Sequence, residues 1–305
     1  MPKNNLHEIA QKLVVPGKGI LAADESLGTI EKRFAKINLP STYESRRAYR
    51  EMLFSTPGLE QCISGIIQFD ETLRDQILKN KNIISIIKVD EGIERGVMKP
   101  MPGLAERLAE YKKLGAQAAK ARATITIGQE NILPNARMQA EYAKICQDAV
   151  IVPMVEPEVL MDGNHTMEQC EKVTEETLRV VFEELEKAGV AFDGMILKPN
   201  MVVPGKESGQ IATPSEVAKA TIRVLKKVLP DELPGVTFLS GGQSEEEATE
   251  NLRAIKANGS FPWRLTFSYG RALQDSALKI WAGKSENIEA AQAKLLERVK
   301  MNSYE

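Results

Sequence analysis

One apolar run, AVIVPMVEPE at residues 149–158, shows the pattern that decides the fold. Its apolar residues are continuous rather than alternating, as expected for a parallel strand that is covered on both faces. The chain has seven further β-rich runs: GKGILAAD (17–24), CISGIIQFD (62–70), IISIIKVD (83–90), AQAAKARATITI (116–127), GMILKPN (194–200), VTFLSGG (236–242) and RLTFSYG (264–270). The sequence therefore predicts eight strands, most of them buried on both faces.

Helical patterns separate these runs. An amphipathic stripe is formed by Ala218, Ile222, Leu225 and Leu229. Residues 167–188 show a similar pattern and precede Gly189, a typical helix stop. Ser244 and Glu247 have the spacing of a capping box, which places a helix start directly after the seventh strand.

Alternating strands and helices predict an α/β fold, a single (β/α)8 TIM barrel over residues 1–305. No Gly/Ser-rich linker or compositional break divides the chain. The tightest connection, residues 71–82, has about the dozen residues that a parallel crossover requires. A doubly wound open sheet is the alternative that this pattern leaves open.

Composition narrows the function classes. The net charge of −2 suggests no nucleic-acid partner, and no apolar run approaches the roughly 18 residues of a membrane span, so we expect a cytoplasmic protein. Two histidines cannot build a three-imidazole zinc site, and the three cysteines have no CxxC spacing. We therefore expect no metal, no cofactor and no disulfide framework.

Charged residues gather at or near the carboxyl ends of the predicted strands, where a barrel carries its chemistry. They are Asp24, Lys88, Asp90, Lys120, Arg122, Glu156, Glu158 and Lys198. Any one of them could be a solvated charge just past a strand. One closed barrel would direct the whole set toward a common opening, which predicts an active site there.

The turns after the last two strands suggest a phosphate site. Backbone N–H groups at Ser240, Gly241 and Gly270, followed by a helix start, can surround an anion, and Arg271 can pair with it. Ser268 belongs to the second of these turns, SYGRA. The alternative is that both segments are only tight turns.

Lys198 is the last residue of an apolar strand, and Pro199 directly after it stops that strand. Burial and neighbouring cations would disfavour its ammonium form, and a neutral amine can form a Schiff base with a ketone. Glu156 would then carry protons, for which we expect its pKa to be raised. In the alternative reading, the lysine stem packs while its head reaches solvent.

The chain resembles the class I fructose-1,6-bisphosphate aldolases, which work through a Schiff base without a metal. The resemblance covers nearly the whole chain and is carried by GKGILAADES, IKVDEG, IVPMVEPEVL, MILKPNMVVPG, PGVTFLSGGQSEEEATENL and LTFSYGRALQDSALKIWAG, in the family's order. It implies reversible cleavage of fructose 1,6-bisphosphate to dihydroxyacetone phosphate and glyceraldehyde 3-phosphate, in glycolysis or gluconeogenesis.

The resemblance also implies roles for individual residues. Lys198 would form the Schiff base, Glu156 would transfer protons during its formation, and Asp24 would accept the substrate's hydroxyl proton, with Lys120 and Glu158 in support. The ketose 1-phosphate would bind at Ser240, Gly241, Ser268, Gly270 and Arg271. The far phosphate would bind at Ser26, Arg33 and Lys88, and the substrate hydroxyls at Arg122.

Three features depart from the family pattern. Ala121 replaces a usual aromatic residue, the loop over residues 93–101 is short, and the chain ends at MNSYE without the mobile tail that ends in a tyrosine. We expect Tyr304 not to replace that tyrosine. Carbanion protonation would then rely on another group or on water, so release of the ketose phosphate could limit turnover.

Two other functions remain open at this point. One is a transaldolase-like or other Schiff-base sugar-phosphate lyase, although two phosphate-binding groups favour a bisphosphate substrate. The other is an inactive barrel that serves as a binding scaffold, although Lys198, Glu156 and Asp24 are all present. Family members often form homo-oligomers, so the resemblance implies a tetramer or a dimer.

Overall fold

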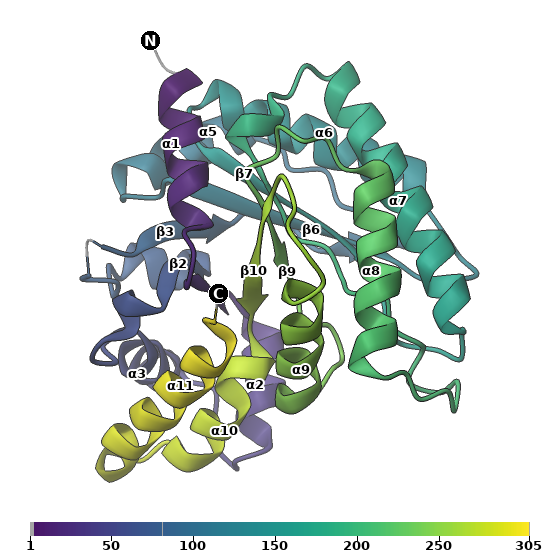
Figure 1. Cartoon of the computed structure of the whole chain (residues 1–305). Coiled ribbons are helices and arrows are strands. Elements are labelled where there is room, and N and C mark those ends of the chain that lie inside the picture. Colours follow the sequence, from purple (N-terminus) through teal and green to yellow (C-terminus); the bar gives the residue numbers. More distant parts are fainter. Residues whose placement is uncertain (1–2, 81, 305) are drawn as a thin grey trace.

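A closed barrel of parallel strands forms the centre of the molecule in the computed structural model, which describes residues 3–80 and 82–304 (Figure 1). The barrel strands are β1 (Gly19–Ala23), β2 (Ile63–Gln68), β3 (Ile84–Lys88), β6 (Ala118–Ile125), β7 (Val152–Val159), β8 (Ile196–Leu197), β9 (Gly235–Phe238) and β10 (Arg264–Tyr269). Strand β1 pairs with both β2 and β10, which closes the barrel. The (β/α)8 prediction is confirmed, and the open-sheet alternative is wrong.

Helices surround this barrel. They are α2 (Leu27–Ala35), α3 (Tyr43–Phe54), α4 (Asp70–Arg74), α5 (Leu104–Lys113), α6 (Ile132–Asp148), α7 (Met167–Lys187), α8 (Pro214–Val228), α9 (Glu245–Lys256), α10 (Arg271–Trp281) and α11 (Ile288–Asn302). The predicted capping box at the start of α9 is confirmed, since Ser244 and Glu247 exchange side-chain to backbone hydrogen bonds of 2.8 and 3.1 Å. No helix in the described part of the chain is long and apolar enough to cross a bilayer.

The short loop after β3 folds into a hairpin that we did not predict. Its strands are β4 (Ile93–Glu94) and β5 (Val97–Met98), joined by a turn with positive φ at Arg95 and Gly96. Asn135 on α6 holds the hairpin, because it donates to the Gly96 carbonyl and accepts from the Met98 N–H, both at 2.8 Å. Two-residue strands are too short to show an alternating pattern in the sequence.

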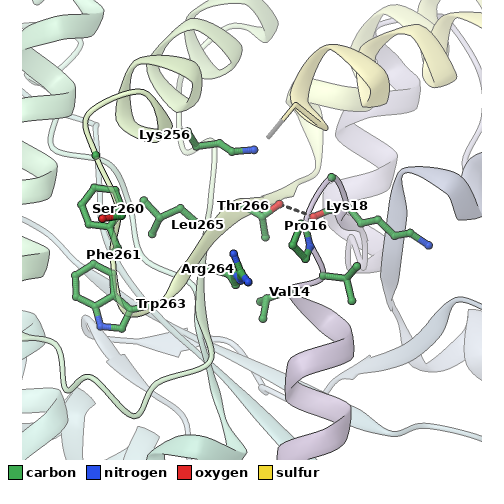
Figure 2. A pocket seen from close by; sticks show the side chains of 13 residues that line it. Val14, Pro16, Lys18, Lys256, Ser260, Phe261, Trp263, Arg264, Leu265 and Thr266 are labelled. Carbon is green, nitrogen blue, oxygen red and sulfur yellow. Dashed lines mark hydrogen bonds between the residues drawn. The ribbon is translucent and has the colours of Figure 1, made fainter.

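Helix α1 (Lys3–Leu13) closes the end of the barrel at which the strands begin. Its side chains Leu6, Ile9 and Leu13 join an apolar cluster with inward-facing strand residues such as Ile86 and Met154. A Cβ at Gly65 would lie 2.8 Å from Leu13 Cδ2, so a glycine is needed for this close packing. A pocket opens beside the end of α1, between it and β10 (Figure 2).

The structure shows where two of the departures from the family pattern, Ala121 and the C-terminal segment, lie in the fold. Ala121 is fully buried in the apolar cluster between the barrel and the outer helices. Helix α11 packs against α3, α9 and α10. It ends near Gly17 and Cys62, which precede β1 and β2, so Tyr304 lies at the end of the barrel opposite the predicted active site.

Candidate active site

A pocket of about 620 Å³ opens at the carboxyl ends of the barrel strands. Every residue that the sequence assigned to catalysis or substrate binding lines it: Asp24, Ser26, Arg33, Lys88, Lys120, Arg122, Glu156, Glu158, Lys198, Ser240, Gly241, Ser268, Gly270 and Arg271. These residues lie on seven of the eight barrel strands, or on the segments that follow those strands; only β2 contributes none of them. A single closed barrel is what brings them together.

Lys198 is buried at the centre of this pocket, with 5% of its side chain exposed. Its backbone N–H donates to the Val155 carbonyl at 2.8 Å, which fixes the residue directly after β8. The side-chain Nζ lies 3.0 Å from Oε1 of Glu156. The ion pair that the structure records for the amine is therefore with a carboxylate, while the cations expected near it, Lys88, Lys120 and Arg122, line the same pocket.

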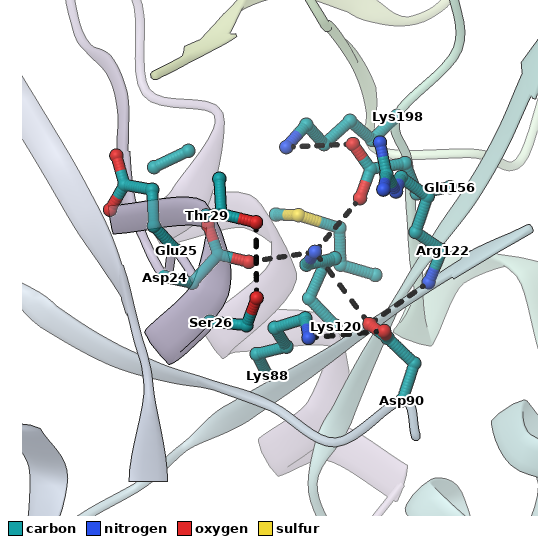
Figure 3. Close-up of polar contacts among 12 residues, drawn as sticks. Asp24, Glu25, Ser26, Thr29, Lys88, Asp90, Lys120, Arg122, Glu156 and Lys198 are labelled. Atoms are coloured by element: carbon teal, nitrogen blue, oxygen red, sulfur yellow. Dashed lines mark hydrogen bonds and ion pairs between the residues drawn. The ribbon is translucent and has the colours of Figure 1, made fainter. Parts of the chain in front are cut away.

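Lys120 occupies the middle of a buried charge network (Figure 3). Its Nζ lies 2.7 Å from Asp24 Oδ2, 3.1 Å from Glu156 Oε2 and 3.8 Å from Asp90 Oδ2. Glu156 thus bridges two lysines, because its other oxygen contacts Lys198. This arrangement holds the Asp24 and Glu156 carboxylates and the Lys198 amine close together.

The network fixes the charge of both carboxylates. Burial raises the pKa of Asp24, but the ammonium groups of Lys120 and Lys198 outweigh it and hold that pKa well below its ordinary value. Burial likewise raises the pKa of Glu156, and Lys120, Lys198 and Arg122 together lower it below the ordinary range. The prediction of a raised pKa at Glu156 is therefore wrong, because the neighbouring cations favour its charged form.

Glu158 is the acid whose pKa does rise. Burial disfavours its charge more strongly than Arg122 stabilises it, although Arg122 Nη1 donates to Glu158 Oε2 at 2.9 Å. Glu156 and Glu158 lie two residues apart on the same face of β7 and still differ in direction, because two lysines contact Glu156 and neither contacts Glu158. The site therefore places a carboxylate and a more readily protonated acid side by side.

The turns after β9 and β10, where the sequence predicts an anion site, both line the pocket. Gly241 has φ of +55°, and α10 begins at Arg271, directly after Gly270, so the N-terminus of a helix, which favours anions, lies beside the pocket. Arg271 Nη2 donates to the Gly241 carbonyl at 2.5 Å, which joins the two turns. The Ser268 hydroxyl is buried and has no hydrogen-bond partner among the described residues, so it is available to a ligand.

The other end of the pocket is formed by α2 and the segments after β1 and β3. Ser26 Oγ and Thr29 Oγ1 are 3.0 Å apart, and Lys88 Nζ lies 3.2 Å from Asp90. Arg33 is already engaged, since it pairs with Glu25 and donates to Gln274 at 3.1 Å and to Asp275 at 3.0 Å. A phosphate at Arg33 would have to compete with these partners.

Sequence reasoning did not single out Glu25 or Thr29, and it placed Asp90 at the barrel opening without a specific role; all three line the pocket. Glu25 directly follows Asp24, and its side chain joins Arg33 to Arg50, the latter at 2.6 Å. The position of Asp90 at a strand end is the signal that placed it at the barrel opening. Among residues 3–80 and 82–304, no group of three or more His, Cys, Asp or Glu side chains is arranged to hold a metal ion.

Known proteins match this chain over nearly its full length. Residues 5–305 match the family model described as "Fructose-bisphosphate aldolase class-I". A fructose-bisphosphate aldolase of Drosophila melanogaster is 50% identical, over 98% of this chain and 89% of its own. "Fructose-bisphosphate aldolase 4, cytosolic" of Arabidopsis thaliana is 48% identical, over 94% of this chain and 79% of its own.

A solved structure has the same fold. It is a ternary complex of the fructose-bisphosphate aldolase of Plasmodium falciparum with TRAP and a small-molecule inhibitor. It superimposes with a TM-score of 0.94 at 47% sequence identity and covers 98% of this chain and 93% of its own.

Proposed function

The chain belongs to the class-I fructose-bisphosphate aldolase family, and from this premise we propose how its pocket works. The proposed reaction is the reversible cleavage of fructose 1,6-bisphosphate to dihydroxyacetone phosphate and glyceraldehyde 3-phosphate through a Schiff base on Lys198. The observation that carries the proposal is a buried lysine whose amine lies 3.0 Å from a carboxylate, inside a pocket with cationic groups at both ends.

The Lys198 amine forms the carbon–nitrogen bond to the substrate, and Glu156 carries the protons that this step requires. The surrounding cations favour the carboxylate form of Glu156, which lies 3.0 Å from the Lys198 amine, so Glu156 can accept a proton from it and leave a nucleophilic amine. The amine adds to the C2 carbonyl of the substrate and gives a carbinolamine. Glu156 then returns the proton to the departing hydroxyl, water leaves, and an iminium forms.

Asp24 and the iminium divide the work of breaking the C3–C4 bond. The Asp24 carboxylate takes the proton of the C4 hydroxyl, the aldehyde leaves, and the electron pair of the broken bond is delocalised into the iminium. Lys120 holds Asp24 in place through the 2.7 Å ion pair. Protonation of the resulting enamine and hydrolysis then release the ketose phosphate.

Two cationic ends favour a bisphosphate over a monophosphate substrate. Arg271 and the N-terminus of α10 would bind the 1-phosphate, while Lys88, Ser26 and Arg33 line the opposite end. We expect Arg271→Gln to raise KM for fructose 1,6-bisphosphate and for fructose 1-phosphate alike. Lys88→Gln should raise KM for the bisphosphate alone, so the ratio of the two substrates tests the orientation.

Trapping is the decisive experiment. Incubation with dihydroxyacetone phosphate followed by borohydride should reduce the Schiff base, and peptide mapping should place the adduct on Lys198. Lys198→Met should form no adduct and lose activity by roughly 10⁵-fold or more. Lys219→Met, at an exposed lysine on α8, is the matched control and should behave as wild type. An adduct elsewhere, or an active Lys198→Met protein, would refute the proposal.

The remaining proposals concern the setting of the enzyme. We propose that the whole chain acts as one barrel domain, that it works in the cytosol in sugar-phosphate metabolism, and that it forms a homo-oligomer. The cytosolic names of the two Arabidopsis relatives support the location. Light scattering on the purified chain tests the oligomer.

A further inference from the structure

Asp90 belongs to the charge network, but the proposed reaction gives it no step. Its side chain is 6% exposed, and one of its carboxylate oxygens lies 3.2 Å from Lys88 Nζ. The other oxygen lies 3.8 Å from Lys120 Nζ and accepts from the Arg122 backbone N–H at 3.4 Å (Figure 3). Asp90 therefore connects a lysine at the end of the pocket proposed for the far phosphate with the lysine that pairs with Asp24.

The segment that carries Asp90 leaves the barrel directly after β3. Val89 still continues the pairing with β6, because its N–H donates to the Lys120 carbonyl at 3.0 Å. Beyond Asp90 the backbone turns at Gly92, whose φ is +89°, and then enters the hairpin of β4 and β5. A connecting segment is less restrained than the elements it joins, so a buried carboxylate on it depends on contacts from elsewhere in the fold.

Arg107 on α5 supplies such contacts on both sides of Asp90. Its Nη1 lies 2.6 Å from Glu91 Oε1, and its Nη2 donates to the Val89 carbonyl at 3.3 Å. A guanidinium is a rigid planar fork, so two contacts through its two terminal nitrogens restrain the segment more closely than a single contact would. Arg107 lies outside the pocket wall, so its influence on the site passes through residues 89–91.

We propose that Arg107 is a positioning residue for the reaction: it holds residues 89–91 in place, and Asp90 thereby keeps Lys88 and Lys120 where the substrate needs them. This inference rests on the proposed aldolase function. Lys120 is the ion-pair partner of Asp24, so a displaced Asp90 would disturb the base that accepts the C4 hydroxyl proton. Lys88 lies at the end proposed for the far phosphate, so the same displacement would weaken the binding of a bisphosphate but not of fructose 1-phosphate.

Removal of the guanidinium separates positioning from a purely structural role. Arg107→Gln should lower kcat for fructose 1,6-bisphosphate and for fructose 1-phosphate by about 10- to 100-fold, since a misplacement of about 1 Å can cost a factor of about 100. It should raise KM for the bisphosphate alone, because Lys88 is displaced and Arg271 is not. A purely structural role would lower the midpoint of urea unfolding without this difference between the two substrates. Arg107→Lys keeps the charge but not the fork, so its kcat should lie between those of wild type and Arg107→Gln.

A second substitution shows whether the effect passes through Asp90. Asp90→Asn removes the carboxylate charge and should by itself lower kcat at least as much as Arg107→Gln. In the double variant, the added Arg107→Gln should change kcat by less than about twofold, because two residues that act through one contact are not additive. Glu91→Gln removes the carboxylate partner of Arg107 and should lower kcat less, since the contact with the Val89 carbonyl remains. This variant keeps the inference testable if Arg107→Gln does not fold.

Arg74→Gln is the matched control. Arg74 on α4 pairs with Glu110 on α5 at 2.7 Å, so its loss removes an ion pair to the same helix that is not made with residues 89–91, and kcat and KM should stay at their wild-type values. The positioning role is overturned if Arg107→Gln and Glu91→Gln turn over within about twofold of wild type, or if the losses of Arg107→Gln and Asp90→Asn add in full. An inactive wild-type protein would refute the proposed function and this inference with it, whereas an active wild type with unchanged variants would refute the inference alone.

Discussion

The two halves of the barrel interior differ in chemistry although the same strands build both. On β7, Val152 and Met154 belong to the apolar cluster under α1, whereas Glu156 and Glu158, on the same face and farther along, line the active site. On β6, Ala118 lies in the cluster and Lys120 in the site. A step of two residues along one strand therefore separates the part that is packed from the part that reacts.

This difference has an energetic meaning. The apolar half buries side chains such as Leu13 and Ile20 completely, which stabilises the fold in proportion to the area removed from water. The charged half buries Lys120, Glu156 and Lys198 to a similar degree, and buried charges are stable only when each has a partner. We therefore expect substitutions in the charged half to affect catalysis, and also stability where they leave a buried charge unpaired, and those in the apolar half to affect stability alone.

After Lys198 itself, the largest effect in the charged half should follow removal of the Glu156 carboxylate. Glu156→Gln keeps the shape but cannot accept the Lys198 proton, so we expect kcat to fall by roughly 10² to 10⁴-fold. Glu158→Gln is the matched control, and its loss should be smaller, because burial already favours the uncharged form of that acid. Steady-state cleavage rates for both variants check this, and equal losses would contradict the division of roles.

The next effect concerns pH. Asp24 and Glu156 have lowered pKa values in the fold, so each contributes stability that is present above its unfolded pKa and lost as the pH falls through its folded pKa. Lys120→Met removes a cation that both share, which raises both folded pKa values. Unfolding on acidification should then begin at a higher pH than in wild type, and breaking the network should cost about 3 to 5 kcal/mol at neutral pH.

Circular dichroism during acid titration measures this shift, and Lys112→Met, at an exposed lysine on α5, is the control. An acid transition at the wild-type pH in Lys120→Met would mean that Lys120 does not hold these carboxylates ionised.

In the apolar half we expect a loss of stability without a loss of catalysis. Leu13→Ala leaves a cavity over Gly65 and Ile86, for which we expect a loss of about 2 to 5 kcal/mol in the free energy of unfolding. Leu133→Ala, on the exposed face of α6, should change it by less than about 0.5 kcal/mol. Urea titration gives both values. The kcat of folded Leu13→Ala should match wild type, and a fall in kcat would show that the two halves are coupled.

Sequence alone predicted the charged half better than the apolar half. Charges at strand ends are visible because continuous apolar runs make them stand out, and barrel closure then determines that Asp24, Lys120 and Lys198 meet. The role of α1 was missed, although the spacing of Leu6, Ile9 and Leu13 is that of an apolar helix face.

What remained unpredictable depends on distances. The pKa direction at Glu156 follows from two ammonium groups within 3.1 Å, and residue spacing cannot supply such contacts. The engagement of Arg33 by Glu25, Gln274 and Asp275 likewise joins segments up to 242 residues apart.

The smallest expected effect is at Tyr304, and it tests the separation of the two ends directly. The ring lies 5.4 Å from the Arg253 guanidinium, next to the amino ends of the strands, and β10 alone puts roughly 20 Å between that end and the active site. Tyr304→Phe keeps the ring and removes the hydroxyl, so tritium exchange on dihydroxyacetone phosphate should equal that of wild type. A sharp loss of exchange would mean that the C-terminal segment reaches Lys198 during turnover, and the enamine proton would then come from Tyr304 instead of from water or a group in the pocket.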